Sequence, residues 1–345
     1  MPNAPALITG GSGFFGSRLR DRLAARGQPV RVFDLADAAD RPAGVEFVAG
    51  DICDGARVAA ACAGCGVVYH CVAQVPLAKN RRLFRAVNVD GTGNLLRAAQ
   101  AARVGKVIYV SSSAVFGAPA ANPVSEQTPP APGEAYGRAK LAGEHLCHGA
   151  SADGLDVTII RPRTIMGDGR LGIFQILFEW IRTGYNVPVL GRGANVYQFV
   201  HADDLADACV LAAGRAGATT YHCGADRFGT MRELLERLCA HAGTGAKVRR
   251  LPMAPAVGLM NLASAVGLSP LGPYHAMMYG RSFYFDIGKA RGELGWQPRF
   301  SNDEMFAQSY DWYVRNREDV LRSNGASPHR SAVGQRALAL VKYLL

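Results

Sequence analysis

The sequence predicts an α/β fold, with a parallel sheet between two layers of helices and a smaller C-terminal lobe. Three observations support this. Short β-rich apolar runs alternate with longer helical stretches through residues 6–161, the pattern of parallel strands joined by helical crossovers. A glycine-rich turn follows the first run. After Arg161-Pro162, segments punctuated by glycine and proline replace the alternation, so a second lobe is expected to begin there.

The first half should contain six strands with four helices between them. The strands are expected at Ala6–Thr9, Val30–Asp34, Glu46–Ala49, Val67–Cys71, Lys106–Ser111 and Asp156–Arg161. The helices are expected at Phe14–Arg26, Gly55–Ala61, Leu83–Arg103 and Glu134–Gly149. Six such strands fit a doubly wound sheet, which binds its ligands at the carboxyl ends of the strands.

The chain is expected to divide into five segments. Residues 1–163 form the sheet domain, 164–195 begin the smaller lobe, 196–227 return to the sheet, 228–322 complete the lobe and 323–345 are a tail. The returning segment should contain a strand through Val200, a helix over 203–213 and a strand over 219–223.

Composition excludes several classes of protein. With 49% hydrophobic and 19% charged residues, the 345-residue chain is that of a globular protein. The net charge of +10 suits an anionic ligand, but arginine is spread along the chain, so nucleic-acid binding is not expected. Short apolar runs and an N-terminus without a secretory pattern predict a cytoplasmic protein with no membrane span. Only Cys62 and Cys65 have a C-x-x-C spacing, so buried thiols are expected rather than a metal site.

The turn after the first strand carries three glycines: Gly10, Gly13 and Gly16. They let backbone N–H groups approach a pyrophosphate, whose charge a helix N-terminus favours. Asp34 ends the second strand, where a carboxylate accepts hydrogen bonds from the adenosine ribose. The same carboxylate repels a 2′-phosphate, and no arginine follows it in Leu35-Ala36-Asp37. These features predict a Rossmann-type domain that binds NAD rather than NADP.

Tyr136 and Lys140 lie four residues apart in a helical stretch, so their side chains share one face. A phenol with a pKa near 10 is a poor base at neutral pH. An ammonium group and an oxidised nicotinamide nearby favour the phenolate, which can remove or return an alcohol proton. Ser112, at the carboxyl end of the fifth strand, is placed to polarise the same oxygen. The set predicts hydride transfer between NAD and a secondary alcohol or ketone.

With these motifs the chain resembles the extended short-chain dehydrogenase/reductase family, the group of NAD-dependent nucleotide-sugar epimerases and dehydratases. The matching motifs are Gly10-x-x-Gly13-x-x-Gly16, Asp34, Asp51-Ile52, His70-Cys71-Val72-Ala73, Asn88-Val89-Asp90-Gly91-Thr92, Ser111-Ser112, Tyr136-x-x-x-Lys140, Arg161-Pro162 and Phe199-Val200-His201-Ala202-Asp203-Asp204. A late Arg291-Gly292-Glu293-Leu294-Gly295-Trp296-Gln297-Pro298 is similar to the family's C-terminal signature.

The resemblance implies a role for each matching position. Gly13, Phe14 and Phe15 would contact the pyrophosphate, Asp34 the adenosine ribose, Asp51 and Ile52 the adenine, Ala73 and Asn88 the cofactor groove, Tyr136 and Lys140 the nicotinamide ribose, and the backbone after Pro162 the nicotinamide. It also implies a homodimer through the helices over 83–103 and 134–149.

The residues beside Ser112 favour one reaction of this family over another. Its dehydratases carry an Asp-Glu pair there, whereas this chain has Ser113-Ala114, so 4,6-dehydration is not expected. Epimerisation at C4 through a 4-keto sugar needs only the Ser/Tyr/Lys set and a tightly held NAD. A simple dehydrogenase needs no more than that, so both remain open.

The expected substrate is a nucleotide sugar, and the residues expected to contact it are Ser113, Thr164, Arg192, Gln198 and His201. Arg192 would replace an arginine that many members have where this chain has Tyr197-Gln198. The apolar segment 172–181 is either a helix packed on its own lobe or an apolar substrate pocket.

Two alternatives remain. The chain also resembles the 3β-hydroxysteroid dehydrogenase branch, on Asn195 and on the apolar stretch Pro252–Pro273 ahead of Phe283-Tyr284-Phe285-Asp286. The other is a non-catalytic NAD-binding module. The tail segment Ser331–Leu345 would serve subunit packing, be disordered, or contact a membrane surface.

Overall fold

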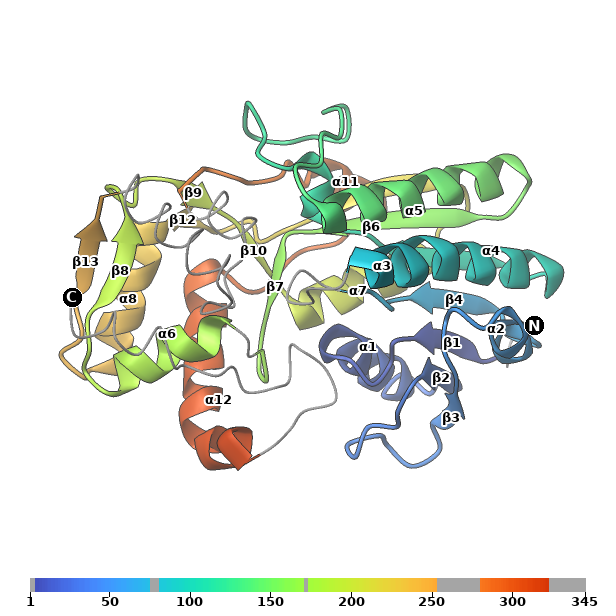
Figure 1. The fold of residues 1–345 in the computed structure, drawn as a ribbon, viewed down its shortest axis with the longest axis horizontal. Helices are drawn as coiled ribbons and strands as arrows, with labels where there is room; N and C mark the ends of the chain where they lie inside the picture. The colour runs from blue at the N-terminus through green and yellow to red at the C-terminus, as the bar shows by residue number, and fades with distance from the viewer. Residues whose placement is uncertain (1–3, 75–80, 171–172, 253–279, 323–345) are drawn as a thin grey trace.

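A seven-stranded parallel sheet forms the centre of the computed structural model, which describes residues 4–74, 81–170, 173–252 and 280–322 (Figure 1). Its strand order is β11-β6-β5-β4-β1-β2-β3. The strands are β1 (Ala6–Thr9), β2 (Val30–Asp34), β3 (Glu46–Ala49), β4 (Val67–His70), β5 (Lys106–Val110), β6 (Val157–Pro162) and β11 (Thr219–Cys223). From β1 the chain adds β2 and β3 on one side and then β4, β5 and β6 on the other, so the strand order reverses between β1 and β4. The doubly wound fold is confirmed.

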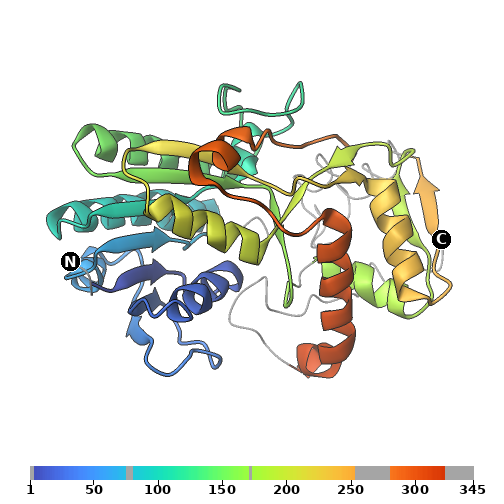
Figure 2. The ribbon, with the colours of Figure 1, turned by 180° about the vertical axis from the view of Figure 1, so that it is seen from behind.

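Helices cover both faces of this sheet because successive strand residues point to opposite sides. Leu7 packs into a core beneath α2 (Gly55–Cys62), α4 (Gly91–Ala101) and α5 (Ala135–Ala152). Its neighbours Ala6 and Ile8 belong to the opposite core, with α1 (Phe14–Ala24) and α7 (Ala202–Ala213). Helices α4 and α5 lie in front of the sheet in Figure 1, and α7 lies in front in Figure 2.

Most expected elements have the expected bounds to within three residues. The exception is the helix expected over Leu83–Arg103. It consists of α3 (Arg81–Arg85), a π-helical segment Ala86–Asp90, and α4, which ends at Ala101. The π-helical segment contains Asn88, whose side chain is buried and turned toward the end of β4.

The smaller lobe contains helices and three two-stranded sheets, β10-β7, β12-β9 and β13-β8. Its elements are β7 (Thr164–Met166), α6 (Ile173–Arg182), β8 (Val187–Leu190), β9 (Val196–Tyr197), β10 (Phe199–His201), β12 (Gly229–Thr230), α8 (Met231–Ala242), β13 (Val248–Leu251) and α12 (Asn302–Arg322). Helix α11 (Gly288–Leu294) packs back against β11 and α7.

One feature of the returning segment differs from expectation. The strand through Val200 is β10, and it pairs in parallel with β7 rather than joining the main sheet. The partner of β10 is β7, which begins at Thr164. The main sheet has already ended there, because β6 and β11 pair only as far as Pro162 and Cys223. Only β11 returns to the main sheet, over the expected residues.

The apolar segment 172–181 forms α6, whose described side chains are mostly buried. The ring of Phe174 packs edge-on against that of Phe306 in α12, with the ring centroids 5.6 Å apart. Phe178 packs in the same way against Tyr310, with the centroids 5.9 Å apart. Of the two interpretations of this segment, a helix packed on its own lobe is therefore confirmed.

The eight cysteines are all unpaired, and Cys62 and Cys65 are buried, as expected. Over the described ranges, no group of three or more metal-binding side chains comes together. None of the helices in the described part of the chain is long and apolar enough to cross a membrane.

Three buried histidines, His70, His201 and His222, predict that the fold is sensitive to acid. Burial lowers the pKa of His70 and His222 to about 3 and that of His201 to about 4. An unfolded histidine titrates near 6.5, so the unfolded chain binds these protons first as the pH falls. The free energy of unfolding should fall from pH 6.5 toward pH 4, by about 2 kcal/mol per histidine at pH 5. Urea unfolding at several pH values measures this, and a flat profile would contradict it.

Candidate active site

The glycine-rich loop packs closely against the chain that follows β4. Gly10 has a φ of +75°, and a Cβ on it would lie 2.9 Å from the backbone nitrogen of Val72. A Cβ on Gly16 would lie 2.0 Å from the carbonyl oxygen of Gly10. Gly13 is the N-cap of α1 and gives it no side-chain cap. The loop is thus shaped so that the first amides of α1 are available to a phosphate.

Asp34 is held at the carboxyl end of β2. Its carboxylate accepts hydrogen bonds from the backbone nitrogens of Ser12 (3.1 Å) and Leu35 (2.8 Å). Burial raises the pKa of this carboxyl, and both hydrogen bonds oppose that rise. A carboxylate has about four acceptor sites, so two remain for the hydroxyls of a ribose. These residues fit a dinucleotide.

The other expected cofactor residues surround the same edge of the sheet. Asp51 is exposed after β3, where its carboxylate accepts from the backbone nitrogen of Cys53, and Ile52 is buried. Both ends of the Asn88 amide bind the backbone of Gln74, at 2.8 and 3.0 Å. Asn88 therefore fixes the loop that carries Ala73. Phe14 and Phe15 are buried in the first turn of α1.

Ser112 and Tyr136 meet at the carboxyl end of β5. Ser112 caps a short helix, with its Oγ accepting from the backbone nitrogen of Ala114 at 3.1 Å, and its hydroxyl is near enough to Tyr136 to lower the pKa of the phenol. Glu134 starts α5 by accepting from the backbone nitrogens of Tyr136 and Gly137, both at 2.6 Å. This cap fixes the helix end that carries the phenol.

Lys140 lies one turn after Tyr136 and is 2% exposed. Its Nζ donates to the carbonyl oxygen of Val110 at 2.8 Å and lies 4.9 Å from the ring centroid of Tyr109. Burial lowers the pKa of Lys140 to about 8. The ammonium group is therefore held at the last residue of β5, at the end of the sheet where the expected cofactor residues lie.

The phenol of Tyr136 is neutral at physiological pH in this structure. Burial raises its pKa to about 12, Glu134 adds to the rise, and the neighbouring Ser112 hydroxyl and the charge of Arg170 oppose it. The phenolate required for proton abstraction therefore depends on a further cation, such as an oxidised nicotinamide.

A buried ion pair that the sequence analysis missed supports α5. Arg161 of β6 donates Nε and Nη2 to Glu144 at 2.9 and 2.6 Å, and Ser111 donates its Oγ to the same carboxylate at 2.5 Å. Glu144 is 1% exposed. The available signal was a charged residue within the apolar strand Thr158-Ile159-Ile160-Arg161, which requires a buried partner.

The residues expected to contact the substrate differ in their surroundings. Thr164 is half-buried, with its Oγ1 3.2 Å from the Oη of Tyr197. Arg192 is exposed beyond β8. The Oγ of Ser113 is buried and accepts from Nη1 of Arg163 at 2.8 Å. Arg163 is a second residue that the sequence analysis missed, since nothing in the sequence distinguishes it from a solvated arginine.

Two of the expected substrate residues, Gln198 and His201, make structural contacts. Gln198 is 1% exposed; its Nε2 donates to Ala225 O at 2.6 Å and its Oε1 accepts from Phe285 N at 2.9 Å. His201 caps α7, because its Nδ1 accepts from the backbone nitrogen of Asp203. Its ring stacks on that of Phe300, with the ring centroids 3.9 Å apart. The amide of Gln198 is thus paired at both ends, whereas Nε2 of His201 is buried without a hydrogen-bond partner among the described residues. A contact of either residue with a substrate stays a prediction.

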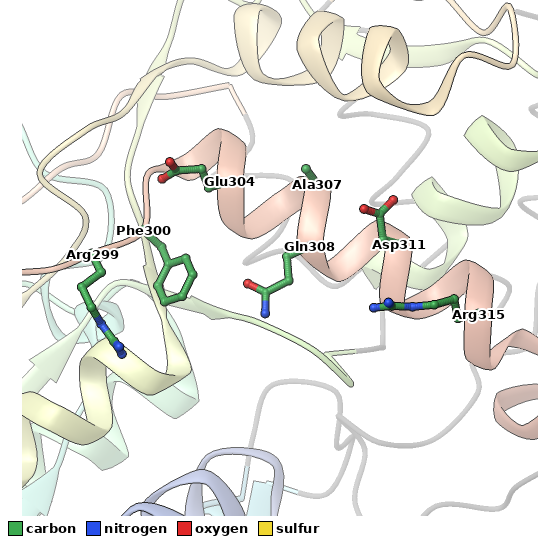
Figure 3. A pocket seen from close by; sticks show the side chains of 7 residues that line it. All are labelled: Arg299, Phe300, Glu304, Ala307, Gln308, Asp311 and Arg315. Carbon is green, nitrogen blue, oxygen red and sulfur yellow. The ribbon is translucent and has the colours of Figure 1, made fainter.

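A pocket of about 500 Å³ lies along α12 (Figure 3). Its lining is Arg299, Phe300, Glu304, Ala307, Gln308, Asp311 and Arg315. None of the expected site residues lines it, so we assign it no part in the site.

Fold and site together define the class, an enzyme of the extended short-chain dehydrogenase/reductase type with a dinucleotide-binding Rossmann domain. Residues 6–224 match the model of the NAD dependent epimerase/dehydratase family. The chain belongs to this family, and its cofactor is NAD.

Known relatives agree with this assignment. The chain is 52% identical to the uncharacterized protein y4nG of Sinorhizobium fredii, over 99% of this chain and 86% of that one. It is 32% identical to a UDP-glucose 4-epimerase of Mycolicibacterium smegmatis (89% and 97% covered). It is 29% identical to the human sterol-4-alpha-carboxylate 3-dehydrogenase (88% and 86%). The solved NAD complex of Thermus thermophilus UDP-glucose 4-epimerase superposes with a TM-score of 0.73, at 26% identity over 90% of this chain and 99% of that one.

Proposed function

We propose that this protein is a NAD-dependent nucleotide-sugar epimerase that inverts C4 through a transient 4-keto sugar. The observation that carries the proposal is the juxtaposition of Ser112 and Tyr136 at the carboxyl end of β5, with Lys140 one turn further along α5 and held on Val110. No carboxylate stands at positions 113 and 114, where the family's dehydratases carry theirs. Support also comes from the 32% identity to a UDP-glucose 4-epimerase.

Each residue of the set has one task in this reaction. NAD, when bound, would supply the site that takes up a hydride and gives it back. Tyr136 removes the proton of the C4 hydroxyl and later returns it. Ser112 hydrogen-bonds the same oxygen and stabilises charge that develops there. Lys140 supplies a fixed positive charge at this edge of the sheet. Asp34 and the loop through Gly13 hold the adenosine half of the cofactor.

The second candidate is a dehydrogenase that acts on a secondary alcohol of an apolar substrate, of the 3β-hydroxysteroid type. The identity to a sterol-carboxylate dehydrogenase favours it. Two of its sequence arguments are weaker now, because Asn195 donates to the Arg281 carbonyl and α6 packs on its own lobe. The stretch 253–273 lies outside the described residues. A non-catalytic NAD-binding module is the third candidate, and the juxtaposed Ser112 and Tyr136 argue against it.

The test separates an isomerisation from a net oxidation. Purified protein is incubated with UDP-glucose without added cofactor, and in parallel with a 3β-hydroxysterol and added NAD. We expect UDP-galactose to form with no net NADH. Stoichiometric NADH with the sterol, and no isomer, would favour the dehydrogenase. Absence of both products would favour the binding module.

We further propose that the protein is a cytoplasmic homodimer, paired through α4 and α5. Leu146 of α5 and Leu83 of α3 are exposed on this side, at 37% and 42%. Arg192 stays a candidate for the nucleotide diphosphate. The tail segment 331–345, with its possible membrane contact, lies outside the described residues.

A further inference from the structure

His70 is the last residue of β4 and lies between two parts of the candidate site. Strand β4 pairs with β1 on one side and with β5 on the other. Its carboxyl end therefore lies between the glycine-rich loop that follows β1 and Ser112, which follows β5. The ring of His70 is 1% exposed. The proposed reaction gives this buried polar side chain no task.

Both ring nitrogens of His70 are hydrogen-bonded to buried threonines. Nδ1 lies 2.7 Å from the Oγ1 of Thr9, the last residue of β1, and Nε2 lies 3.0 Å from the Oγ1 of Thr92 in α4. The hydroxyl of Thr92 also lies 3.0 Å from the carbonyl oxygen of Asn88. A carbonyl oxygen can only accept, so the single hydroxyl proton of Thr92 is donated to it.

This bond fixes the direction of the others. Because the proton of Thr92 goes to Asn88, its oxygen accepts from Nε2 of His70. A neutral imidazole has one N–H group, so Nδ1 is the acceptor and Thr9 is its donor. Burial and the charge of Lys140 lower the pKa of His70 to about 3, so the ring is neutral at physiological pH. A single tautomer therefore joins Thr9 to Asn88 through hydrogen bonds that all run the same way.

The two ends of this hydrogen-bonded chain hold the two loops that border the expected cofactor groove. Thr9 directly precedes Gly10, whose φ of +75° begins the glycine-rich turn. Asn88 binds the backbone of Gln74 with both ends of its amide, at 2.8 and 3.0 Å, and so fixes the loop that follows β4. The two loops also pack directly against each other. His70 thus links them from the buried side.

We propose that His70 is a positioning residue for NAD, which holds the glycine-rich loop and the loop after β4 in the arrangement that the dinucleotide requires. Because its ring is buried, His70 acts through Thr9 on one side and through Thr92 and Asn88 on the other. The role does not depend on the proposed epimerisation, because a net dehydrogenase needs the same bound NAD. A histidine that served only the core would need no directed link between these loops.

The two hydrogen bonds of the ring should affect different parts of the cofactor. Asp34 and the glycine-rich loop are expected to hold the adenosine and the pyrophosphate, which are also present in ADP. The loop after β4 lies on the other side of β1, toward Ser112 and Tyr136, where the nicotinamide half is expected. Loss of the bond to Thr9 should therefore weaken ADP and NAD alike, whereas loss of the bond to Thr92 should weaken NAD more than ADP.

Two amide substitutions separate these bonds. The amide of asparagine reaches roughly the place of Nδ1 and that of glutamine the place of Nε2, so His70→Asn keeps a partner for Thr9 and His70→Gln keeps one for Thr92. Titration calorimetry with ADP and with NAD is carried out on the full chain after bound nucleotide has been removed. His70→Gln should weaken both ligands by roughly 10-fold. His70→Asn should weaken NAD by roughly 10-fold and ADP by no more than about 3-fold.

The matched control is His222→Asn. His222 is also a buried histidine, with its Nδ1 3.3 Å from the carbonyl oxygen of Val124, but it lies on β11 at the edge of the sheet. This substitution should lower the free energy of unfolding and change neither affinity. Affinities near the wild-type values in both His70 variants overturn the proposal. So does an equal loss of both ligands in both variants, or a loss that His222→Asn reproduces.

A second pair of substitutions serves if the His70 variants do not fold. Thr9→Val and Thr92→Val remove the same two bonds from their other ends and keep the ring in place. Thr9→Val should weaken ADP and NAD alike, and Thr92→Val should weaken NAD more than ADP. Absence of this difference overturns the positioning role of His70.

Discussion

Tyr136→Phe should lower kcat for the epimerisation by about 10²- to 10⁴-fold while NAD stays bound. The substitution removes the hydroxyl that exchanges the substrate proton and leaves the ring in place. The cofactor loop around Gly13 and the carboxylate of Asp34 are untouched, because they belong to the turn before α1 and to the end of β2, whereas Tyr136 is on α5. Steady-state kinetics and the cofactor content of the purified variant measure the two effects.

The matched control is Tyr310→Phe, which removes a phenol oxygen from the buried face of α12. It should leave kcat within a few-fold of the wild-type value. If Tyr136→Phe keeps full turnover, another residue acts as the base and the proposed mechanism is wrong. A biological effect that persists without turnover would instead favour the binding module.

Glu144→Ala should lower the free energy of unfolding by about 3–5 kcal/mol. The substitution leaves Arg161 buried without its two carboxylate oxygens and takes away the acceptor of Ser111. It also loosens α5 from β5 and β6, so Tyr136 should lose its position relative to Ser112. Chemical denaturation measures the first effect, and the residual activity of the folded variant measures the second.

Glu236→Ala is the control for this change. Glu236 pairs with Arg232 at 2.7 Å on an exposed face of α8, where an ion pair contributes less than about 1 kcal/mol. A similar loss of stability in both variants would show that the burial of Glu144 is not what makes its ion pair important.

The sequence by itself determined the fold class, the strands of the main sheet, the cofactor and the grouping of Ser112, Tyr136 and Lys140. These features depend on local patterns. The periodicity of apolar residues sets each strand and helix. Glycine is required in the first turn because a Cβ there would lie as close as 2.0 Å to a backbone atom. The spacing of Tyr136 and Lys140 on one helix needs no tertiary information.

The tertiary structure alone decided which buried polar side chains find partners within the chain. Four polar side chains have roles that depend on partners 17 to 99 positions distant or on burial between elements: Gln198, His201, Glu144 and Arg163. Sequence spacing does not show whether such a side chain joins two lobes or faces a ligand, because the distinction depends on which hydrogen-bonding groups remain unpaired after packing. After packing, Nε and Nη2 of Arg163 have no hydrogen-bond partner, whereas both ends of the Gln198 amide have one.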